Sequence, residues 1–234
     1  MTAPLLTIRD LSVIYDRWGS EVHALQGINL NLFLGEWVML AGPNGAGKST
    51  LLRAISGEVS YGGEIRFENR VANARSQCYG VQQNPIVGTS SSLTVLENLW
   101  LIDEAPPRRR PGAVAKYANL LTALNLSKKL EHPVESLSGG ERQILAVFMG
   151  TLTTHPLILL DEPTAALDPL NEQYCLSLMG GIRKAGRTLL HVSHKVAQHQ
   201  FADRVVLLEG GQLAPNAIAP PTNSRHVQSV PLSL

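Results

Sequence analysis

The chain has 234 residues, 44% of them hydrophobic and 17% charged, and carries a formal net charge of +1 at pH 7. This composition excludes an intrinsically disordered chain, and the length suits one domain with a substantial core. A charge so close to zero gives no electrostatic reason to expect a nucleic-acid partner.

The sequence predicts neither membrane insertion nor a cysteine-based site. Arg9 and Asp10 interrupt the start of the chain before an apolar run of signal-peptide length develops. Apolar runs such as LILL and VVLL have the length of strands, far below the roughly 20 residues that a spanning helix needs. Cys78 and Cys175 are isolated, which argues against a disulfide framework or a zinc site. If the protein acts at a membrane, we expect another chain to hold it there.

Strands are predicted in the first third of the chain, together with one helix. Segments 5–15, 28–32 and 63–69 suggest antiparallel strands, and INLNL at 28–32 alternates apolar with polar side chains. The apolar run EWVMLAG at 36–42 predicts a buried strand that ends in glycine, and KSTLLRAIS at 48–56 predicts a helix.

The middle of the chain is predicted to be helical, and the last third returns to strands. Residues 93–153 have helical periodicity, interrupted by the proline-rich loop 105–112. Buried strands are predicted at 156–162 and 188–193, and a strand with a Gly-Gly turn at 204–213. Apolar strands alternating with helices predict an α/β core with a mainly parallel sheet, into which a helical subdomain is inserted.

The segment GPNGAGKST matches the phosphate-loop pattern G-x-x-x-x-G-K-[ST]. It lies between a predicted buried strand and a predicted helix, so its glycines let backbone N–H groups surround phosphate oxygens at a helix N-terminus. Lys48 is expected to contact the β- and γ-phosphates, and the Ser49 hydroxyl to bind Mg²⁺. An ordinary glycine loop is the alternative. The residues expected to bind the nucleotide are Gly42, Pro43, Asn44, Gly45, Ala46, Gly47, Lys48, Ser49 and Thr50.

Two carboxylates end the predicted strand in LILLDEP. Open α/β sheets bind their ligands at the carboxyl ends of the strands, so Asp161 and Glu162 are expected to face the phosphates. Asp161 would hold Mg²⁺, and Glu162 would be the general base that deprotonates the attacking water. The alternative is an acidic pair that is merely solvated.

Two adjacent glycines open the predicted helix in ESLSGGERQILAVF, where each Gly costs up to about 1 kcal/mol relative to Ala. The S-x-x-E spacing of Ser138 and Glu141 is typical of a capping box, which explains neither Gly139 nor Gly140. A helix N-terminus with bare backbone is a second phosphate site. We therefore expect two copies to meet head to tail, so that Ser138, Gly139 and Gly140 of one copy cover the γ-phosphate held by the other.

In order and spacing these motifs resemble those of the ATP-binding-cassette (ABC) ATPases, with LSGGE at the place of that family's signature motif. The resemblance covers the chain to about Leu213. It implies a RecA-like P-loop core with an N-terminal antiparallel β subdomain, forming one nucleotide-binding domain over residues 1–213. A helical subdomain is inserted at about 84–153, and residues 214–234 are expected to be a flexible tail. The implied activity is ATP hydrolysis, with Mg²⁺ as the cofactor of ATP.

The resemblance assigns further roles near the nucleotide. Tyr15 matches the aromatic residue that stacks on adenine, with Trp18 as one alternative and an ordinary strand tyrosine as the other. Gln83, in YGVQQNP, matches the glutamine that contacts Mg²⁺ and the attacking water and links the core to the helical subdomain. Gln82, one residue earlier, is the weaker candidate for that role.

Two more residues match the family on the C-terminal side. Asp168, in AALDP, matches a residue that crosses the dimer interface, and His194, in HVSHK, matches the histidine that contacts the γ-phosphate. His191 lies within the predicted strand and is assigned a structural role. Lys195 stands where an acidic residue is common in the family, and Ala165 where a hydroxyl residue is common. Neither departure removes a catalytic group, so hydrolysis is still expected.

By the same resemblance, the chain would be the energy subunit of a membrane transporter, bound peripherally at the cytoplasmic face of the cell membrane. The expected partners are an integral-membrane permease, a second copy or a paralogous ATPase, and a solute-binding protein; no nucleic acid is expected. The segment PIVGTSSSLTVLENLWL would receive a helix of the permease. Its apolar residues would line that groove or pack in the core instead: Ile86, Leu96, Leu99 and Trp100.

The similarity of RQILAVFMGTLTTHPLILLDEPTAALDP to uptake ATPases favours import. A soluble cassette ATPase acting on nucleic acid or ribosomes is the alternative function. The chain has neither the long coiled-coil insertion nor the second cassette of such proteins. A P-loop kinase would leave LSGGE unexplained.

Overall fold

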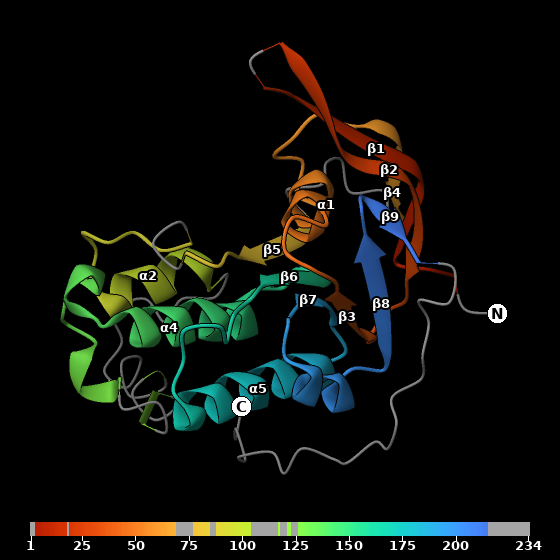
Figure 1. Cartoon of the computed structure of the whole chain (residues 1–234). Helices are drawn as coiled ribbons and strands as arrows, with labels where there is room; N and C mark the ends of the chain where they lie inside the picture. Colours follow the sequence, from red (N-terminus) through yellow and green to blue (C-terminus); the bar gives the residue numbers. More distant parts are fainter. Residues whose placement is uncertain are drawn as a thin grey trace. The chain divides into compact units, whose positions relative to one another are not determined.

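The computed structural model describes residues 3–17, 19–68, 77–84, 88–103, 117, 121–122 and 126–214 (Figure 1). Its contacts divide the chain into two compact units, which are described separately below. Unit 1 comprises the described residues of Met1–Gly80, His155–Glu162 and Arg183–His226, and unit 2 those of Val81–Thr154 and Pro163–Ile182.

An antiparallel sheet of three strands lies in unit 1, in the order β2-β1-β4, as the N-terminal sequence pattern predicts. Alternation places side chains such as Leu6 and Ile8 in the core and leaves Arg9 exposed on the other face. The strands are β1 Leu6–Arg17, β2 Ser20–Leu32 and β4 Gly62–Phe67.

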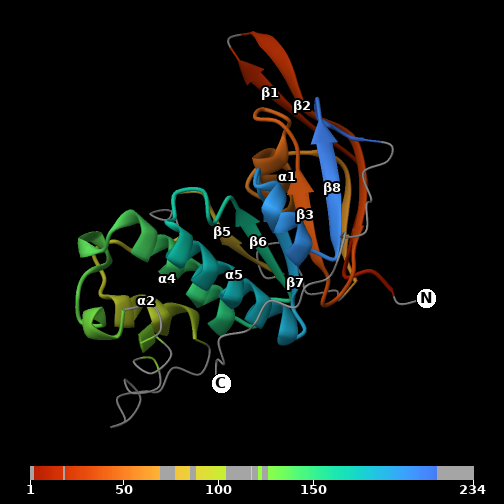
Figure 2. The ribbon, with the colours of Figure 1, turned by 60° about the horizontal axis from the view of Figure 1, so that its bottom comes forward.

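A second sheet has the strand order β5-β6-β7-β3-β8-β9 (Figures 1 and 2). The strands β6, β7, β3 and β8 run parallel, and β9 returns antiparallel to β8. Every residue of β3 and β7 is buried, which explains why these strands read as continuous apolar runs rather than as alternating ones. The strands are β3 Trp37–Ala41, β5 Cys78–Val81, β6 Leu157–Asp161, β7 Thr188–Val192, β8 Arg204–Glu209 and β9 Gln212–Leu213.

The described residues form α-helices and short 3₁₀ helices. The α-helices are α1 Lys48–Ile55, α2 Val95–Ile102, α4 Gly139–Leu152 and α5 Pro169–Lys184. Short 3₁₀ helices are η2 Ser127–Lys129, η3 Val134–Ser136 and η4 Val196–Phe201.

Helices α2 and α4 pack against each other in unit 2, and each begins with a complete capping box, at Thr94–Glu97 and at Ser138–Glu141. The predicted loop 105–112 and the tail from residue 215 lie outside the described residues. In the part of the chain that is described, no helix has the length and apolarity needed to cross a bilayer.

Candidate nucleotide-binding site

The phosphate loop joins β3 to α1, and its two pattern glycines are required by the fold. Gly42 has φ +142° and Gly47 has φ +103°, both in the region that favours glycine. A Cβ at Gly42 would lie 2.0 Å from the carbonyl oxygen of Leu208 on β8, and one at Gly47 would lie 2.5 Å from the carbonyl oxygen of Ala24 on β2. The loop backbone is therefore pressed against both sheets of unit 1.

The N-terminus of α1 has the properties of an anion site. Gly47 caps it in the left-handed conformation without a side-chain acceptor, and no acidic residue occupies the first turn. Its leading N–H groups thus have no competing carboxylate, and the helix dipole favours negative charge there.

Lys48 provides a buried cation in the same loop. Its Nζ donates hydrogen bonds to the carbonyl oxygens of Gly42, at 2.9 Å, and Pro43, at 2.8 Å. Burial lowers the pKa of Lys48, and the negative charges of Glu162 and Asp161 oppose that shift. Within the described residues its ammonium forms no ion pair, so its charge is available to a phosphate.

Asp161 ends β6, and Glu162 follows it with an unusual backbone. Adjacent strand residues normally point to opposite faces, but Glu162 has φ +49°, in the left-handed region. Such a conformation in a non-glycine residue is strained and clusters at functional sites. Both carboxylates act electrostatically on Lys48. Burial raises the pKa of Asp161, and interaction with the Ser49 hydroxyl opposes the rise.

His194 follows β7 and contacts the second carboxylate. Its Nε2 lies 2.6 Å from Oε1 of Glu162, with the two side chains 36% and 20% exposed. The backbone N–H of Glu162 also donates to the carbonyl of Val192, at 3.1 Å, which fixes the turn after β6 against β7. His191, by contrast, lies inside β7 and is fully buried, consistent with a structural role.

Tyr15 lies on β1 in unit 1 and is half-buried against the core. Its hydroxyl is buried and has no hydrogen-bond partner within the described residues. Trp18, the alternative aromatic residue, lies outside the described part of the chain. Stacking of Tyr15 on adenine stays a prediction.

The signature segment forms the first turn of α4 in unit 2. Ser138 is its N-cap: Oγ accepts a hydrogen bond from the backbone N–H of Glu141 at 3.2 Å, and Glu141 Oε2 accepts one from the N–H of Ser138 at 2.9 Å. Apart from its chain neighbours and its own helix backbone, no described atom lies within 4 Å of a Cβ built on Gly139. One built on Gly140 would meet Leu167 Cδ2 at 3.4 Å and Asn171 Nδ2 at 3.9 Å, which are ordinary contact distances. Unlike the phosphate loop, this segment does not need its glycines for its own packing.

Two further predicted residues lie in unit 2. Gln83 is exposed directly after β5, and Gln82 beside it is half-buried. Asp168 caps α5: its Oδ1 accepts hydrogen bonds from the N–H groups of Leu170 and Asn171, both at 3.0 Å. The hydrogen bond from the Asn171 backbone lowers the pKa of Asp168, so this carboxylate stays ionised. The predicted roles of Gln83 and Asp168 at a nucleotide or a dimer interface stay predictions.

The apolar residues of the predicted permease groove are mostly core residues. Leu96 and Leu99 are buried in α2, at 5% and 0% exposure. Trp100 is half-buried, and Ile86 lies outside the described residues. The apolar side chain that α2 does expose is Leu101, at 67%. Core packing, the second of the two interpretations, therefore fits Leu96 and Leu99.

A contact that the sequence analysis missed supports the signature segment from outside the motif. Lys129 Nζ lies 2.6 Å from Oε1 of Glu141. The two residues are twelve positions apart in different elements, so no helical spacing rule could have linked them. The signal available in the sequence was Lys129 itself, a lysine upstream of the predicted capped helix that contains Glu141.

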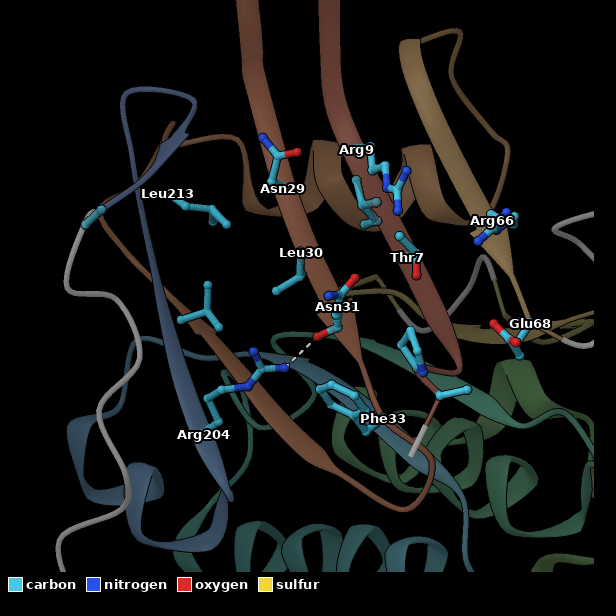
Figure 3. Close-up of a pocket in the computed structure, with 15 residues that line it drawn as sticks. Thr7, Arg9, Asn29, Leu30, Asn31, Phe33, Arg66, Glu68, Arg204 and Leu213 are labelled. Atoms are coloured by element: carbon cyan, nitrogen blue, oxygen red, sulfur yellow. Dashed lines mark hydrogen bonds between the residues drawn. The ribbon is translucent and has the colours of Figure 1, made fainter. Parts of the chain in front are cut away.

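A pocket of about 730 Å³ lies elsewhere in unit 1, on the polar face of β1, β2 and β4 beside β8 and β9 (Figure 3). It shares no lining residue with the phosphate loop, Asp161, Glu162 or His194. Arg204, at its edge, pairs with Glu36 at 2.8 Å and donates to the backbone carbonyl of Asn31 at 2.7 Å. The pocket is thus separate from the phosphate-binding groups.

Comparisons with known proteins agree with this geometry. The family described as "ABC transporter" matches residues 25–165. An uncharacterized ABC transporter ATP-binding protein of Mycobacterium bovis is 32% identical over 96% of this chain and 70% of its own length. The lipoprotein-releasing system ATP-binding protein LolD 2 of Chlorobium chlorochromatii is 31% identical over 91% of this chain and 95% of its own length.

A solved structure is similar in fold. It is a dimeric ATP-binding cassette in a post-hydrolysis state with ADP and Pi, with a TM-score of 0.77 and 24% identity over 93% of this chain and 99% of that chain. The family match covers more than half of this chain. Along the chain, the phosphate loop, the signature segment at the start of α4 and the carboxylate pair follow in the expected order. The chain therefore belongs to the ABC transporter family, as an ATP-binding subunit that couples ATP hydrolysis to transport.

Proposed function

We infer that two copies of the cassette, or this chain and a paralogous ATPase, close head to tail on shared ATP. The observation that carries this proposal is the exposed, capped start of α4, whose glycines make no contact that their own unit requires. Bare backbone at a helix N-terminus suits close approach of a phosphate. The dimeric state of the similar cassette supports the same arrangement.

In each copy the phosphate loop would hold the nucleotide. Lys48 offers a buried ammonium already fixed on loop carbonyls, and the α1 N-terminus offers unpaired N–H groups. Ser49 and Asp161 fit Mg²⁺, because a hydroxyl and a carboxylate are the oxygen ligands that this ion takes together with substrate phosphates. Gln83 would supply an amide oxygen to the same ion. When bound, Mg²⁺ neutralises charge on the phosphates.

Glu162 is the proposed general base. His194 Nε2 donates to its Oε1, which leaves Oε2 to accept a proton from water. The water oxygen bonds to the γ-phosphorus as the bond to the β–γ bridging oxygen breaks, giving ADP and phosphate. His194 holds the carboxylate and is also the proposed contact of the γ-phosphate.

Ser138 would act on the nucleotide of the opposite copy without giving up its cap. Its Oγ is the acceptor in the capping box, and a hydroxyl also carries one donor hydrogen. In the structure the Ser138 side chain also hydrogen-bonds the Glu141 carboxylate, and a turn of the hydroxyl would pass that hydrogen to a phosphate oxygen while Oγ keeps its cap. Capping α4 and donating to a γ-phosphate are therefore compatible in one conformation. Asp168 is the proposed interface contact, and Tyr15 the proposed adenine contact.

The proposed setting is the cytoplasmic face of a cell membrane, against an integral-membrane permease, with ATP and Mg²⁺. Import with a solute-binding protein is the proposed direction, supported by the resemblance of residues 142–169 to uptake ATPases. The LolD relative is named for lipoprotein release. A transport assay that showed release rather than uptake would therefore contradict the proposed import.

Replacing Glu162 with Gln tests the mechanism. Because Gln cannot take the proton, we expect turnover to fall by about 10²–10⁴ while ATP still binds. Light scattering should then detect a dimer that forms only with ATP and Mg²⁺. Lys48→Ala, which removes the phosphate contact, is the control that should stay monomeric. A Glu162→Gln protein that is monomeric at saturating ATP and Mg²⁺ would count against the shared site.

A further inference from the structure

The contact between Lys129 and Glu141 lies next to the proposed phosphate-covering helix start. Lys129 Nζ and Glu141 Oε1 are 2.6 Å apart, with side chains 35% and 23% exposed. A partly buried, charge-assisted hydrogen bond of this length belongs to the stronger class of polar contacts.

Glu141 connects this lysine to the N-cap. Oε1 of Glu141 accepts a hydrogen bond from Lys129 Nζ, and Oε2 accepts one from the backbone N–H of Ser138. The backbone N–H of Glu141 in turn donates to Ser138 Oγ. Partial burial alone would raise the pKa of Glu141, but the hydrogen bonds from Lys129 and Ser138 outweigh it and lower the pKa. The carboxylate is therefore ionised while it holds the cap.

An ionised carboxylate beside a phosphate site has an electrostatic cost. Glu141 is the acidic residue in the first turn of α4, where its negative charge would repel an approaching polyphosphate. A cation within hydrogen-bond distance offsets that repulsion. Lys129 is placed to do so, and its own segment is anchored, since the N–H groups of Val95 and Leu96 donate to the carbonyls of His132 and Leu130, each at 3.0 Å.

We propose that Lys129 is a positioning residue for nucleotide sharing: it neutralises Glu141 and fixes it so that the capped Ser138 can meet the γ-phosphate held by a second cassette. The inference rests on the proposed function, because it concerns the same helix start. Lys129 itself need not touch the nucleotide.

The test uses full-length protein and a charge-rescue design. Lys129→Met should lower steady-state ATP turnover about tenfold, the worth of a hydrogen bond to a charged group. Nucleotide affinity of the monomer should not change, because the phosphate loop is untouched. Lys129→Arg, which keeps the cation, should stay within about twofold of wild type. Lys128→Met, on the exposed neighbouring lysine of η2, is the matched control and should behave as wild type.

The decisive comparison is made in a Glu141→Gln background, where Gln can still accept the hydrogen bond from Ser138 but carries no charge to neutralise. There, Lys129→Met should change turnover by less than about twofold. An undiminished tenfold loss would assign Lys129 to packing and overturn the proposal, as would wild-type turnover of the single variant. Lys129→Gln replaces Lys129→Met if thermal unfolding shows that the latter does not fold.

Failure of this inference can be told apart from failure of the shared-site mechanism. If Glu162→Gln forms no ATP-dependent dimer and Ser138→Ala keeps full turnover, the shared site itself is wrong, and Lys129 has no such role. If both variants behave as expected and Lys129→Met is still silent, only the role of Lys129 is lost.

Discussion

His191 should make the stability of the protein fall in mild acid. Its side chain is fully buried in β7 against Trp37, with ring centroids 6.1 Å apart, and neither ring nitrogen has a partner within the described residues. Burial lowers its pKa from 6.5 to about 3. The folded state therefore excludes a proton that the unfolded chain binds below about pH 6.5.

The sign and size follow from these two pKa values. The contribution of His191 to stability is complete above pH 6.5 and is lost progressively as the pH falls toward 3. Between about pH 7.5 and pH 5, linkage gives a loss of about 2 kcal/mol in the free energy of unfolding. Replacing His191 with Leu, of similar volume, should remove this component and cost little at neutral pH, because it also removes two buried polar atoms without partners.

Denaturant unfolding followed by tryptophan fluorescence, at both pH values, measures the effect. The remaining histidines and carboxylates are common to both proteins, so the difference between wild type and His191→Leu isolates one residue. We expect that difference to shift by about 2 kcal/mol in favour of the variant at the lower pH. A shift below about 0.5 kcal/mol would show that His191 can be protonated in the folded protein and would refute the reasoning.

The glycines of the phosphate loop and of the signature segment should respond oppositely to substitution. Gly139→Leu should fold normally and bind ATP as a monomer but abolish turnover, because no described atom crowds that position; weak monomer binding in a nucleotide titration would instead give the glycine a local role. Gly42→Ala should lower the free energy of unfolding by at least about 2 kcal/mol, because its Cβ would meet the Leu208 carbonyl at 2.0 Å. Wild-type stability of Gly42→Ala in thermal denaturation would contradict the close contact.

The sequence predicted those parts of the site that depend on local patterns. The phosphate loop, the strand that ends at Asp161 and the cap at Ser138 each lie within a few consecutive residues, where spacing alone indicates backbone geometry. The left-handed backbone of Glu162 could not be predicted, because nothing about a glutamate after a strand favours that region.

Contacts between side chains that are far apart along the chain could not be predicted from the sequence either. The Glu162–His194 and Lys129–Glu141 contacts join residues from separate elements, and only the tertiary structure brings them together. For Leu96 and Leu99 the apolar pattern fitted a groove and a core equally well, since hydrophobicity does not say what covers a side chain.

The close contact of Gly42 with Leu208 gives the end of the second sheet a part in nucleotide binding. The hairpin of β8 and β9 packs against the phosphate loop and supports it, since the N–H of Gly211 also donates to the carbonyl of Ala46, at 3.1 Å. Residues more than 160 positions downstream of the loop thus support it. Destabilising that hairpin would therefore remove backbone contacts that hold the phosphate loop in place, although none of the hairpin's residues belongs to a nucleotide-binding motif.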